Sequence, residues 1–534
     1  MPDRYGINQS KLKLFLKLAA WQIKRHPLQL IRILALAVIS PRRDTIARLS
    51  AWANDIPSLA AAPEYAKWRD QFDRLSHDTI ENMRKRQKTL RHRPLFSIIM
   101  PTYQSNIGYL TEAIESVQNQ IYDNWELCIA DDASPNPDVK AVLTKYAHQD
   151  PRIKLAFREQ NGNISAASNT ALSLAKGDFI ALMDHDDLIP AHSLYLVAKE
   201  IEKFPDVDII FTDEDKIDEK GIRYSPHFKL GWNREILLHQ NMVNHLGIYR
   251  TSLVRKVGGF RTGLEGSQDH DLALRVSEQT IRKKIRHIPK ILYHWRVFQR
   301  SGSFSATNGD RAVKAAIKAV SDHLTRTGEP ALVTASNQHS CDIHIVRQVQ
   351  KTRPSIAICG LGAEITLENL RRLKNEFVEA LPDIQIIRGQ NARLIAHRTN
   401  ADMLLLVDQF AYPLQDNWLD LLVAQLQAPN VGAVGPSIID GNGIVVQSPL
   451  HQERDGKILF PHQGKLWASP GYFGRMHIPQ ECTALERNFL LTRREHVLQT
   501  NALLDSSVSV TAYCRTLAKM NLLNVWDPRV VIQI

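Results

Sequence analysis

The chain lacks the features of a membrane-spanning or disulfide-bonded protein. None of its apolar runs reaches the ~18 residues that a bilayer-spanning helix needs. The residues after Met1 lack the pattern of a secretory signal peptide. Its five cysteines are widely separated and form no CxxC pair, so we expect neither a disulfide framework nor a zinc site. These absences favour a reducing, cytoplasmic location.

The composition is that of a folded protein with several domains. Of 534 residues, 44% are hydrophobic and 23% are charged, which excludes a wholly disordered chain. The net charge is +11, but residues 1–93 hold 19 Lys or Arg and 8 Asp or Glu, so the whole excess lies there. The neutral remainder argues against a body built to bind nucleic acid.

The basic segment 1–93 begins with an amphipathic pattern. In residues 9–25, apolar side chains recur at helical spacing, and Lys13, Lys17 and Lys24 fall on another face. Such a helix can lie on an anionic membrane surface, which would make the protein peripheral on the inner face of the cytoplasmic membrane. The alternative is a pair of helices docked on the next domain with solvated lysines.

From Pro94 onward, short apolar segments alternate with helical patterns. This alternation predicts an α/β domain with a mainly parallel sheet, whose ligands bind at the carboxyl ends of the strands. The expected strands are residues 96–100, 125–130, 153–157, 179–183 and 287–294, and the expected helices include residues 110–117, 138–146, 165–174 and 272–278.

Two of these strands end in paired acids. Asp131 and Asp132 follow one strand, and Asp184, His185 and Asp186 follow another. Acids at such positions cost folding free energy unless a cation, a base or a hydroxyl group interacts with them. The spacing of Asp184 and Asp186 suits one hard divalent cation on a diphosphate, although a helix N-terminus offers a structural use for the same pattern.

A second acidic pair, Asp269 and Asp271, precedes the helix expected at 272–278. Either acid could cap the free N–H groups of that helix, which is the structural alternative to a catalytic role. The last expected strand ends in His294, and a lone histidine is more often a structural hydrogen-bonding group than a ligand.

Taken in order, these segments resemble the family 2 glycosyltransferases with the GT-A fold, especially bacterial enzymes that build O-antigen, capsule and similar surface polysaccharides. The resemblance covers residues 96–296. It departs from many relatives at Gln268, where Glu is common, and at Ser168, where Arg is common. Its landmarks are Met100-Pro-Thr-Tyr103, Asp131-Asp-Ala-Ser134, Asn161-Gly-Asn-Ile-Ser165, Lys176-Gly-Asp178, Met183-Asp-His-Asp-Asp187, Gly258-Gly-Phe260, Ser267 to Arg275 and Tyr293-His-Trp-Arg296.

The resemblance implies a role for each matching position. Asp269 would be the catalytic base of an inverting transfer, and Asp186 and His294 would hold Mg²⁺ or Mn²⁺ on the donor diphosphate. The implied donor-binding residues are Pro101, Thr102, Tyr103, Asp132, Asn161 and Asp184. The residues implied on the acceptor side, or as structural supports, are Gln268, Asp271, Arg275 and Trp295.

These residue types suit the chemistry of sugar transfer. The leaving nucleoside diphosphate gains negative charge, which a divalent cation offsets as a Lewis acid. The attacking acceptor hydroxyl loses its proton to a nearby carboxylate. The implied reaction is hexosyl or deoxyhexosyl transfer from a UDP or dTDP sugar to a lipid-linked or other glycan.

Residues 354–534 repeat the plan in altered form. Asn400 to Phe410 parallels Lys176 to Asp186, but phenylalanine replaces the metal-binding Asp186. A phenylalanine cannot bind a hard cation. We therefore expect a catalytic domain at 94–330, a linker at 331–353 and a degenerate, non-catalytic GT-A-like domain at 354–534.

Two other functions remain open at this stage. A nucleotidyltransferase is disfavoured because residues 102–108, which follow the first strand, contain no Lys or Arg. A non-catalytic nucleotide-sugar or glycan-binding scaffold is favoured slightly by Gln268 and Ser168 and opposed by the intact acids at 184, 186 and 269.

Overall fold

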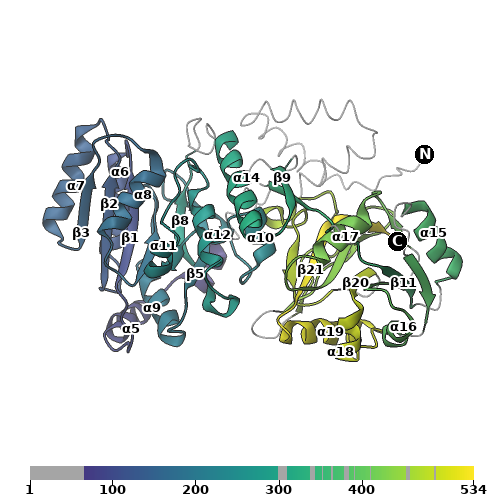
Figure 1. The fold of residues 1–534 in the computed structure, drawn as a ribbon. Helices are drawn as coiled ribbons and strands as arrows, with labels where there is room; N and C mark the ends of the chain where they lie inside the picture. Colours follow the sequence, from purple (N-terminus) through teal and green to yellow (C-terminus); the bar gives the residue numbers. More distant parts are fainter. Residues whose placement is uncertain are drawn as a thin grey trace, which may run out of the picture. The chain divides into compact units, whose positions relative to one another are not determined.

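A computed structural model describes the chain at residues 65–298, 309–336, 343–350, 353–361, 365–377, 384–389, 391–408, 411–452, 458–485 and 489–534. The amphipathic pattern of residues 9–25 lies outside the described residues. In the described part, residues 65–351 form one compact unit and residues 352–534 form another (Figure 1). Among the described residues, no helix combines the length and the apolar character needed to cross a membrane.

The first unit is built on an eight-stranded sheet with the order β3-β2-β1-β4-β7-β5-β6, in which β8 also pairs with β5. Its strands are β1 (Phe96–Thr102), β2 (Trp125–Asp131), β3 (Ile153–Phe157), β4 (Phe179–Leu182), β5 (Ile209–Ile217), β6 (Arg223–His227), β7 (Gly247–Arg250) and β8 (Ile285–Arg296).

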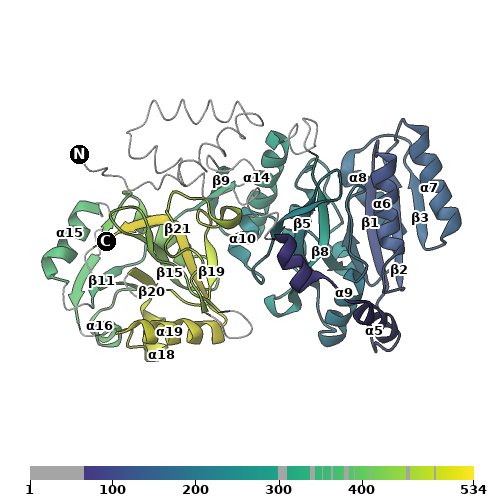
Figure 2. The same cartoon turned by 180° about the vertical axis from the view of Figure 1, so that it is seen from behind.

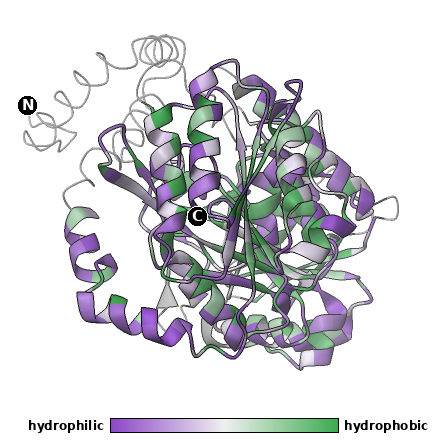
Figure 3. Cartoon of the chain, turned by 90° about the vertical axis from the view of Figure 1, so that its left-hand side faces the viewer, coloured by the Kyte–Doolittle hydropathy of each residue, from purple (hydrophilic) through white to green (hydrophobic). Residues whose placement is uncertain are grey.

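The helices of this unit cover both faces of the sheet. In α6, the residues Leu110, Ile114 and Val117 recur at helical spacing and are fully buried against the sheet. Figure 3 shows such patterns as bands of hydrophobic and hydrophilic residues along the helices. The helices are α5 (His77–Gln87), α6 (Ile107–Gln118), α7 (Pro137–Gln149), α8 (Asn163–Leu174), α9 (Ser193–Lys203), α10 (Arg234–His239), α11 (Thr251–Lys256), α12 (Gln268–Ser277) and α14 (Gly309–Arg326).

The expected α/β class is confirmed, and the sheet is more mixed than expected. Strands β3, β2, β1 and β4 are parallel, but β7 runs antiparallel to both β4 and β5, and β6 is antiparallel to β5. Because β7 is antiparallel to both of its neighbours, β5 runs in the same direction as β4. Strand β8 is parallel to β5 and so shares this direction.

The residues expected to be a linker include a hairpin. β9 (Ala331–Ala335) pairs antiparallel with β10 (Ile343–Arg347), and Val333 and Ile345 are buried in the core of the first unit. Both guanidinium nitrogens Nη1 and Nη2 of Arg347 donate to the carboxylate of Glu235 at 2.9 Å. The first unit therefore extends to about residue 351.

Two of the landmark motifs, at residues 176–178 and 258–260, stabilise the fold. Asp178 accepts from the backbone N–H of Leu95 at 2.9 Å, and a Cβ at Gly177 would lie 2.5 Å from the Leu95 carbonyl oxygen. Only glycine allows the chain to pass this close to the start of β1. Gly259 has a φ of +69°, and a Cβ there would lie 2.5 Å from the side-chain oxygen of Asn169. That side chain bonds both backbone groups of Phe260.

The second unit repeats the strand plan of the first. Its strand order β12-β11-β13-β20-β15-β21 matches β2-β1-β4-β7-β5-β8, and every neighbouring pair has the same relative direction. The strands are β11 (Ile356–Gly360), β12 (Ile384–Arg388), β13 (Met403–Val407), β15 (Val431–Ile439), β20 (Phe489–Arg493) and β21 (Leu523–Gln533), as Figure 2 shows from behind.

Short strands and helices complete the second unit. The additional strands are β14 (Tyr412–Pro413), β16 (Val445–Gln447), β17 (His451–Gln452), β18 (Ile458–Leu459) and β19 (Gln480–Cys482). The helices are α15 (Leu367–Phe377), α16 (Ala392–Arg398), α17 (Trp418–Leu426), α18 (Arg494–Thr500) and α19 (Ser507–Lys519). Helices α18 and α19 lie between β20 and β21 in sequence, as α11 and α12 lie between β7 and β8.

Candidate active site

The acids singled out in the sequence lie at one edge of the first sheet. Because β1, β2, β4, β5 and β8 run in one direction, their carboxyl ends meet there. Asp184 lies two residues after the end of β4, and its backbone N–H donates to the Tyr293 hydroxyl on β8 at 3.2 Å. His294 is the next residue of β8, and its backbone pairs with Leu188 in both directions.

Three of the predicted carboxylates form one electrostatic group. Burial raises the pKa of Asp184, and the negative charges of Asp186 and Asp269 raise it further, while His245 opposes them. Asp269 stands on the first turn of α12, eighty-five residues after Asp184, so the fold rather than the sequence brings these two together. The predicted metal-binding and base carboxylates therefore share one site.

The end of β8 holds the loop that carries Asp186. The Arg296 side chain donates from Nε to the Asp186 carbonyl oxygen at 2.7 Å, and the Arg296 backbone N–H donates to Asp187 at 2.7 Å. The Tyr293 hydroxyl donates to the other oxygen of Asp187 at 2.5 Å. Asp187 is 1% exposed and stabilises this loop from inside, whereas Asp184 and Asp186 are half-buried and remain partly accessible to solvent.

A half-buried histidine that the sequence analysis missed, His245, lies beside these acids. Nδ1 of His245 is 2.7 Å from a carboxylate oxygen of Glu214, and its ring stacks on Tyr293 with centroids 4.6 Å apart. Although burial alone would lower it, Glu214 and then Asp184 raise the pKa of His245 to about 9. For Glu214, burial alone would raise the pKa, but Lys229 and His245 hold it well below its usual range.

The residues fit a divalent cation that is shared with a substrate. In the part of the chain that the structure describes, no three His, Cys, Asp or Glu side chains gather to hold a metal ion alone. Mg²⁺ is usually bound through one or two carboxylates together with substrate phosphates, so such a cage is not needed. Burial is the main cause of the raised pKa of Asp184; the charges of Asp186 and Asp269 add to it, and a bound cation would offset those charges. Nδ1 of His294 is held by Asp215 at 2.5 Å, as in many metal-binding histidines.

Asp269 and Asp271 lie on helix α12 in different surroundings. The helix begins at Gln268, four residues earlier than expected, so Asp269 and Asp271 both lie in its first turn. Neither is the N-cap residue, which is Ser267 and makes no side-chain cap bond. Asp269 is half-buried, and its Oδ1 accepts from the backbone N–H of His270 at 2.8 Å. It can therefore present a carboxylate oxygen to a substrate.

Asp271, Arg275 and Gln268 belong to the support of the helix. The side chain of Asp271 is fully buried between Arg261 and Arg275, with Nε of Arg275 at 2.7 Å. Arg275 also donates to two backbone carbonyls in the turn at residues 257–259. Gln268 accepts from the backbone N–H of Gly266 at 2.8 Å. Of the two alternatives for these residues, the contacts are those of structural supports.

The predicted donor-side residues lie at the same edge. Thr102 is buried at the end of β1 after Pro101, and its hydroxyl lies 3.2 Å from Asp131. Tyr103 is 43% exposed, which leaves its ring available for a ligand. Trp295 follows His294 on β8, and its ring lies 6.0 Å from that of His245.

Asp132 has protein partners for its carboxylate. Nε of Arg158 donates to it at 2.7 Å, and the backbone N–H of Gly162 donates at 3.0 Å. Asn161 donates to the Asp132 carbonyl oxygen at 3.2 Å. With only 2% of Asp132 exposed, the structure assigns it the task of holding this turn, and its contact with a nucleotide stays a prediction.

The second unit keeps only one of the three site acids at the matching positions. By the register of the paired strands, Met403 matches Phe179, so Asp408 takes the place of Asp184 and Phe410 that of Asp186. Counted from the caps Ser506 and Ser267, Val508 takes the place of Asp269. Residue 410 itself lies outside the described residues.

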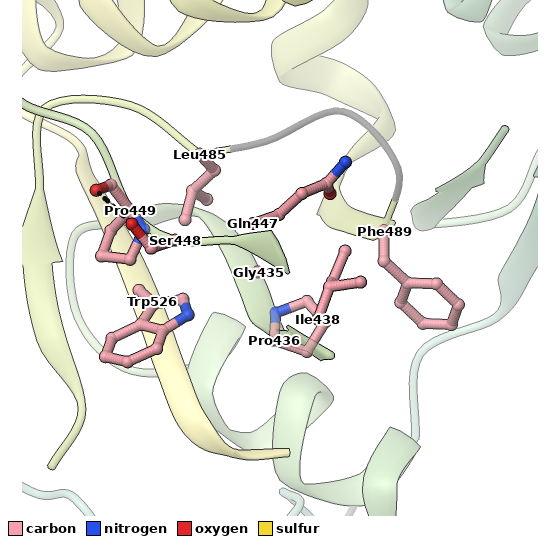
Figure 4. Close-up of a pocket in the computed structure, with 9 residues that line it drawn as sticks. All are labelled: Gly435, Pro436, Ile438, Gln447, Ser448, Pro449, Leu485, Phe489 and Trp526. Atoms are coloured by element: carbon pink, nitrogen blue, oxygen red, sulfur yellow. Dashed lines mark hydrogen bonds between the residues drawn. The ribbon is translucent and has the colours of Figure 1, made fainter. Parts of the chain in front are cut away.

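The pocket found in this unit has a different character. It is lined by nine residues that include Trp526, Phe489 and Leu485, and none of the nine is acidic (Figure 4). It therefore offers no carboxylate for a metal or for general-base chemistry.

Comparison with known proteins identifies the first unit. Residues 97–258 match the family model of glycosyl transferase family 2. The chain carries a family 2 glycosyltransferase domain. With this match and the mixed α/β sheet, the predicted GT-A class holds, and a second sheet-rich domain follows the glycosyltransferase domain in the chain.

Curated relatives extend beyond this domain. The chain is 33% identical over 505 residues to the uncharacterized protein y4gI of Sinorhizobium fredii, across 86% of this chain and 55% of that protein. It is 28% identical over 428 residues to the O-antigen biosynthesis protein RfbC of Myxococcus xanthus, across 73% and 32% of the two chains. The chondroitin synthase of Escherichia coli is 29% identical over 250 residues, across 46% and 35%. The chain thus spans about half or less of the length of these relatives.

Two solved structures are also similar to parts of this chain. S. aureus TarS 1–349 in complex with UDP-GlcNAc matches with a TM-score of 0.36 and 22% identity, over 43% of this chain and 66% of that one. The mannosyltransferase PcManGT from Pyrobaculum calidifontis, in complex with GDP-Man and Mn²⁺, matches with a TM-score of 0.34 and 17% identity, over 53% and 75%.

Proposed function

We propose that the chain is a metal-dependent, inverting glycosyltransferase that moves a sugar from a nucleoside-diphosphate sugar to a glycan acceptor in the synthesis of a surface polysaccharide. The observation that carries the proposal is the shared electrostatic site of Asp184, Asp186 and Asp269 at the carboxyl ends of the strands. The family match and the relative named for O-antigen biosynthesis support the substrate class. A lipid-linked acceptor and a UDP or dTDP donor are the finer form of the proposal.

The proposed reaction is a single displacement. The acceptor hydroxyl oxygen attacks the anomeric carbon and passes its proton to Asp269. The bond from the anomeric carbon to the β-phosphate oxygen breaks, and its electron pair leaves with the nucleoside diphosphate. One base on the face opposite the leaving group suffices, since no covalent intermediate forms.

The other residues bind and orient the donor. Asp186 and His294 would hold Mg²⁺ or Mn²⁺, which supplies Lewis-acid stabilisation of the leaving diphosphate. Asp184 would orient the ribose or the sugar, and Tyr103 offers an exposed ring beside the base-binding end of β1. The Arg296 side chain donates to the backbone carbonyl oxygen of Asp186. This bond holds the loop that carries the Asp186 carboxylate in place before substrate arrives.

The second unit is proposed to be non-catalytic. The residues at the matching positions, Phe410 and Val508, can neither bind a hard cation nor accept a proton. Its strand plan is retained while acids are absent at the positions of Asp186 and Asp269, which leaves acceptor binding or support of the first unit as its contribution.

The test compares three variants of the full chain. Asp269→Asn should lower sugar transfer by ~10²–10⁴-fold because the base is lost while the shape is kept. Asp186→Ala should abolish the stabilisation that a metal–nucleotide gives in a thermal-shift panel of UDP and dTDP sugars with Mn²⁺, Mg²⁺ or EDTA. Asp138→Asn, an exposed acid in the first turn of α7, is the matched control and should behave as wild type.

The outcomes separate enzyme from binding protein. Transfer at the wild-type rate by Asp269→Asn would reject the assignment of the base. Metal-dependent nucleotide binding by the wild type, without turnover on a broad panel of glycan acceptors, would instead favour a nucleotide-sugar-binding scaffold.

A further inference from the structure

Asp215, near the end of β5, is a fully buried carboxylate at the centre of a polar network. Its Oδ1 lies 2.5 Å from Nδ1 of His294. Its Oδ2 accepts from Nε of Arg223 at 2.6 Å and from the hydroxyl of Tyr65 at 2.5 Å. The carboxylate is thus shared by one residue of the proposed donor site and two residues outside it.

The network reaches a segment that precedes the whole sheet. Arg223 also donates to the carboxylate of Asp73 at 2.7 Å and to the Tyr65 hydroxyl at 3.2 Å. Tyr65 is 4% exposed, and its ring stacks on that of Trp68 at 5.8 Å. The segment Tyr65–Asp73 lies outside residues 97–258, which the family model matches. It nevertheless contacts the residues that hold His294, through the Tyr65 hydroxyl on Asp215 and the Asp73 carboxylate on Arg223.

This geometry fixes the orientation of the imidazole. An ionised carboxylate is only an acceptor, and the ion pair with Arg223 keeps Asp215 in that form, so the proton lies on Nδ1 of His294. Nε2 is then the ring nitrogen that can bind a ligand. A carboxylate behind a metal-binding histidine has this effect, and its loss commonly costs 10–100-fold in metal affinity.

We propose that Asp215 is a positioning residue that orients His294 toward the donor diphosphate and its cation, and that Tyr65 and Arg223 hold Asp215 in place for this purpose. The segment Tyr65–Asp73 is therefore a working part of the donor site. The proposal rests on the proposed function, because it takes His294 to be a contact of the metal or the phosphate.

The experiment separates metal-dependent from metal-independent binding. Calorimetry on the full chain measures the affinity for UDP, dTDP and GDP, each with Mn²⁺ and with EDTA. Asp215→Asn should weaken binding of the favoured nucleotide with Mn²⁺ by about 10–100-fold and leave its binding in EDTA unchanged. Tyr65→Phe, which removes one of the donors to Asp215, should weaken only the Mn²⁺-dependent binding, by a few fold.

Two further variants make the result decisive. Tyr146→Phe is the matched control, since its hydroxyl also donates to a carboxylate, that of Glu115 at 2.8 Å, on the helices α6 and α7. It should bind as wild type. His294→Ala tests the assumption beneath the proposal and should weaken Mn²⁺-dependent binding at least as much as Asp215→Asn.

Each contrary result has one meaning. If His294→Ala weakens Mn²⁺-dependent binding and Asp215→Asn and Tyr65→Phe do not, the positioning role is rejected while the proposed function stands. If His294→Ala also has no effect, or no nucleotide binds the wild type with Mn²⁺, the proposed metal site itself fails and the positioning role fails with it. Equal losses with Mn²⁺ and with EDTA would mark Asp215 as a structural residue only. If Asp215→Asn does not fold, Tyr65→Phe decides by the same comparison.

Discussion

The imidazole of His245 lies on the ring of Tyr293, with centroids 4.6 Å apart, and its Nδ1 is 2.7 Å from Glu214. The backbone N–H of His245 donates to the same carboxylate oxygen at 2.8 Å. The histidine is therefore fixed by two bonds beside Asp184, whose pKa it lowers against burial and the neighbouring acids. The raised pKa of His245 favours its protonated form in an acidic site.

Replacing this charge should change the pH dependence of transfer. His245→Gln removes the group that opposes the raised pKa of Asp184, so that pKa should rise further. The acidic limb of a plot of kcat/KM against pH should shift to higher pH. An unchanged limb would show that Asp184 does not have to be ionised for donor binding.

The stability of the protein should also depend on pH through the titration of His245. The pKa of His245 is raised from 6.5 to about 9, so the folded state binds the proton more tightly than the unfolded state. This contribution is fully present below pH 6.5 and is lost as pH rises toward 9. Urea unfolding of the wild type should show a decline in stability over that window that is smaller in His245→Gln.

Asp269 and Asp271 should respond to mutation in opposite ways. Asp271→Ala leaves Arg261 and Arg275 without their buried partner and should cost ~3–5 kcal/mol of stability. Asp269→Asn, two residues away on a half-exposed site, should leave the unfolding midpoint near the wild-type value and remove transfer. Denaturant unfolding and a transfer assay on both variants test this. A stable, inactive Asp271→Ala would contradict the assignment of Asp271 to the helix support.

The sequence was sufficient to predict the strands that lead to the site. Residues 153–157 match β3 at both ends, and β2 and β4 each differ from the expected strand by one residue at the carboxyl end. These segments are short, apolar and bounded by turns, so their local pattern matches their buried environment. The acids that follow them could be assigned to one edge by topology alone.

Strand β5 could not be predicted in the same way. Its run Asp213-Glu-Asp215 reads as a polar loop, yet all three acids are buried. Each carboxylate contacts a basic side chain from another element of the fold, such as His287, whose Nε2 lies 2.8 Å from Asp213. The support of His294 and the charge of His245 depend on these long-range pairs, so no local pattern could reveal them.

Residues 331–347 should be needed for the stability of the first unit. The carboxylate of Glu235 is 1% exposed and pairs with Arg347 on β10 and with Arg234. Burial would raise the pKa of Glu235, but these arginines lower it to about 2. Its stabilising effect is thus present above pH 4.5 and is lost as pH falls toward 2.

Arg347→Met should lower the free energy of unfolding by ~3–5 kcal/mol, since it removes the nearer of the two arginines that compensate the buried carboxylate of Glu235. Differential scanning calorimetry of the full chain measures the shift. The control Arg353→Met removes an arginine that is 45% exposed and pairs with Asp420 at 3.6 Å, so it should change stability by no more than ~1 kcal/mol. Equal behaviour of the two variants would show that the hairpin contributes nothing to the first unit.

The duplicated strand plan offers a matched test of which unit is catalytic. Asp184 and Asp408 stand at the same position of their sheets, one residue after equivalent strand positions. Asparagine keeps the shape of either side chain and removes its charge. Asp184→Asn should lower transfer by at least ~10-fold through weaker donor binding, whereas Asp408→Asn should stay within twofold of wild type. Because both substitutions are isosteric, unfolding curves can confirm that neither changes the fold. Loss of transfer in Asp408→Asn at unchanged stability would mean that the second unit takes part in the reaction despite Phe410 and Val508.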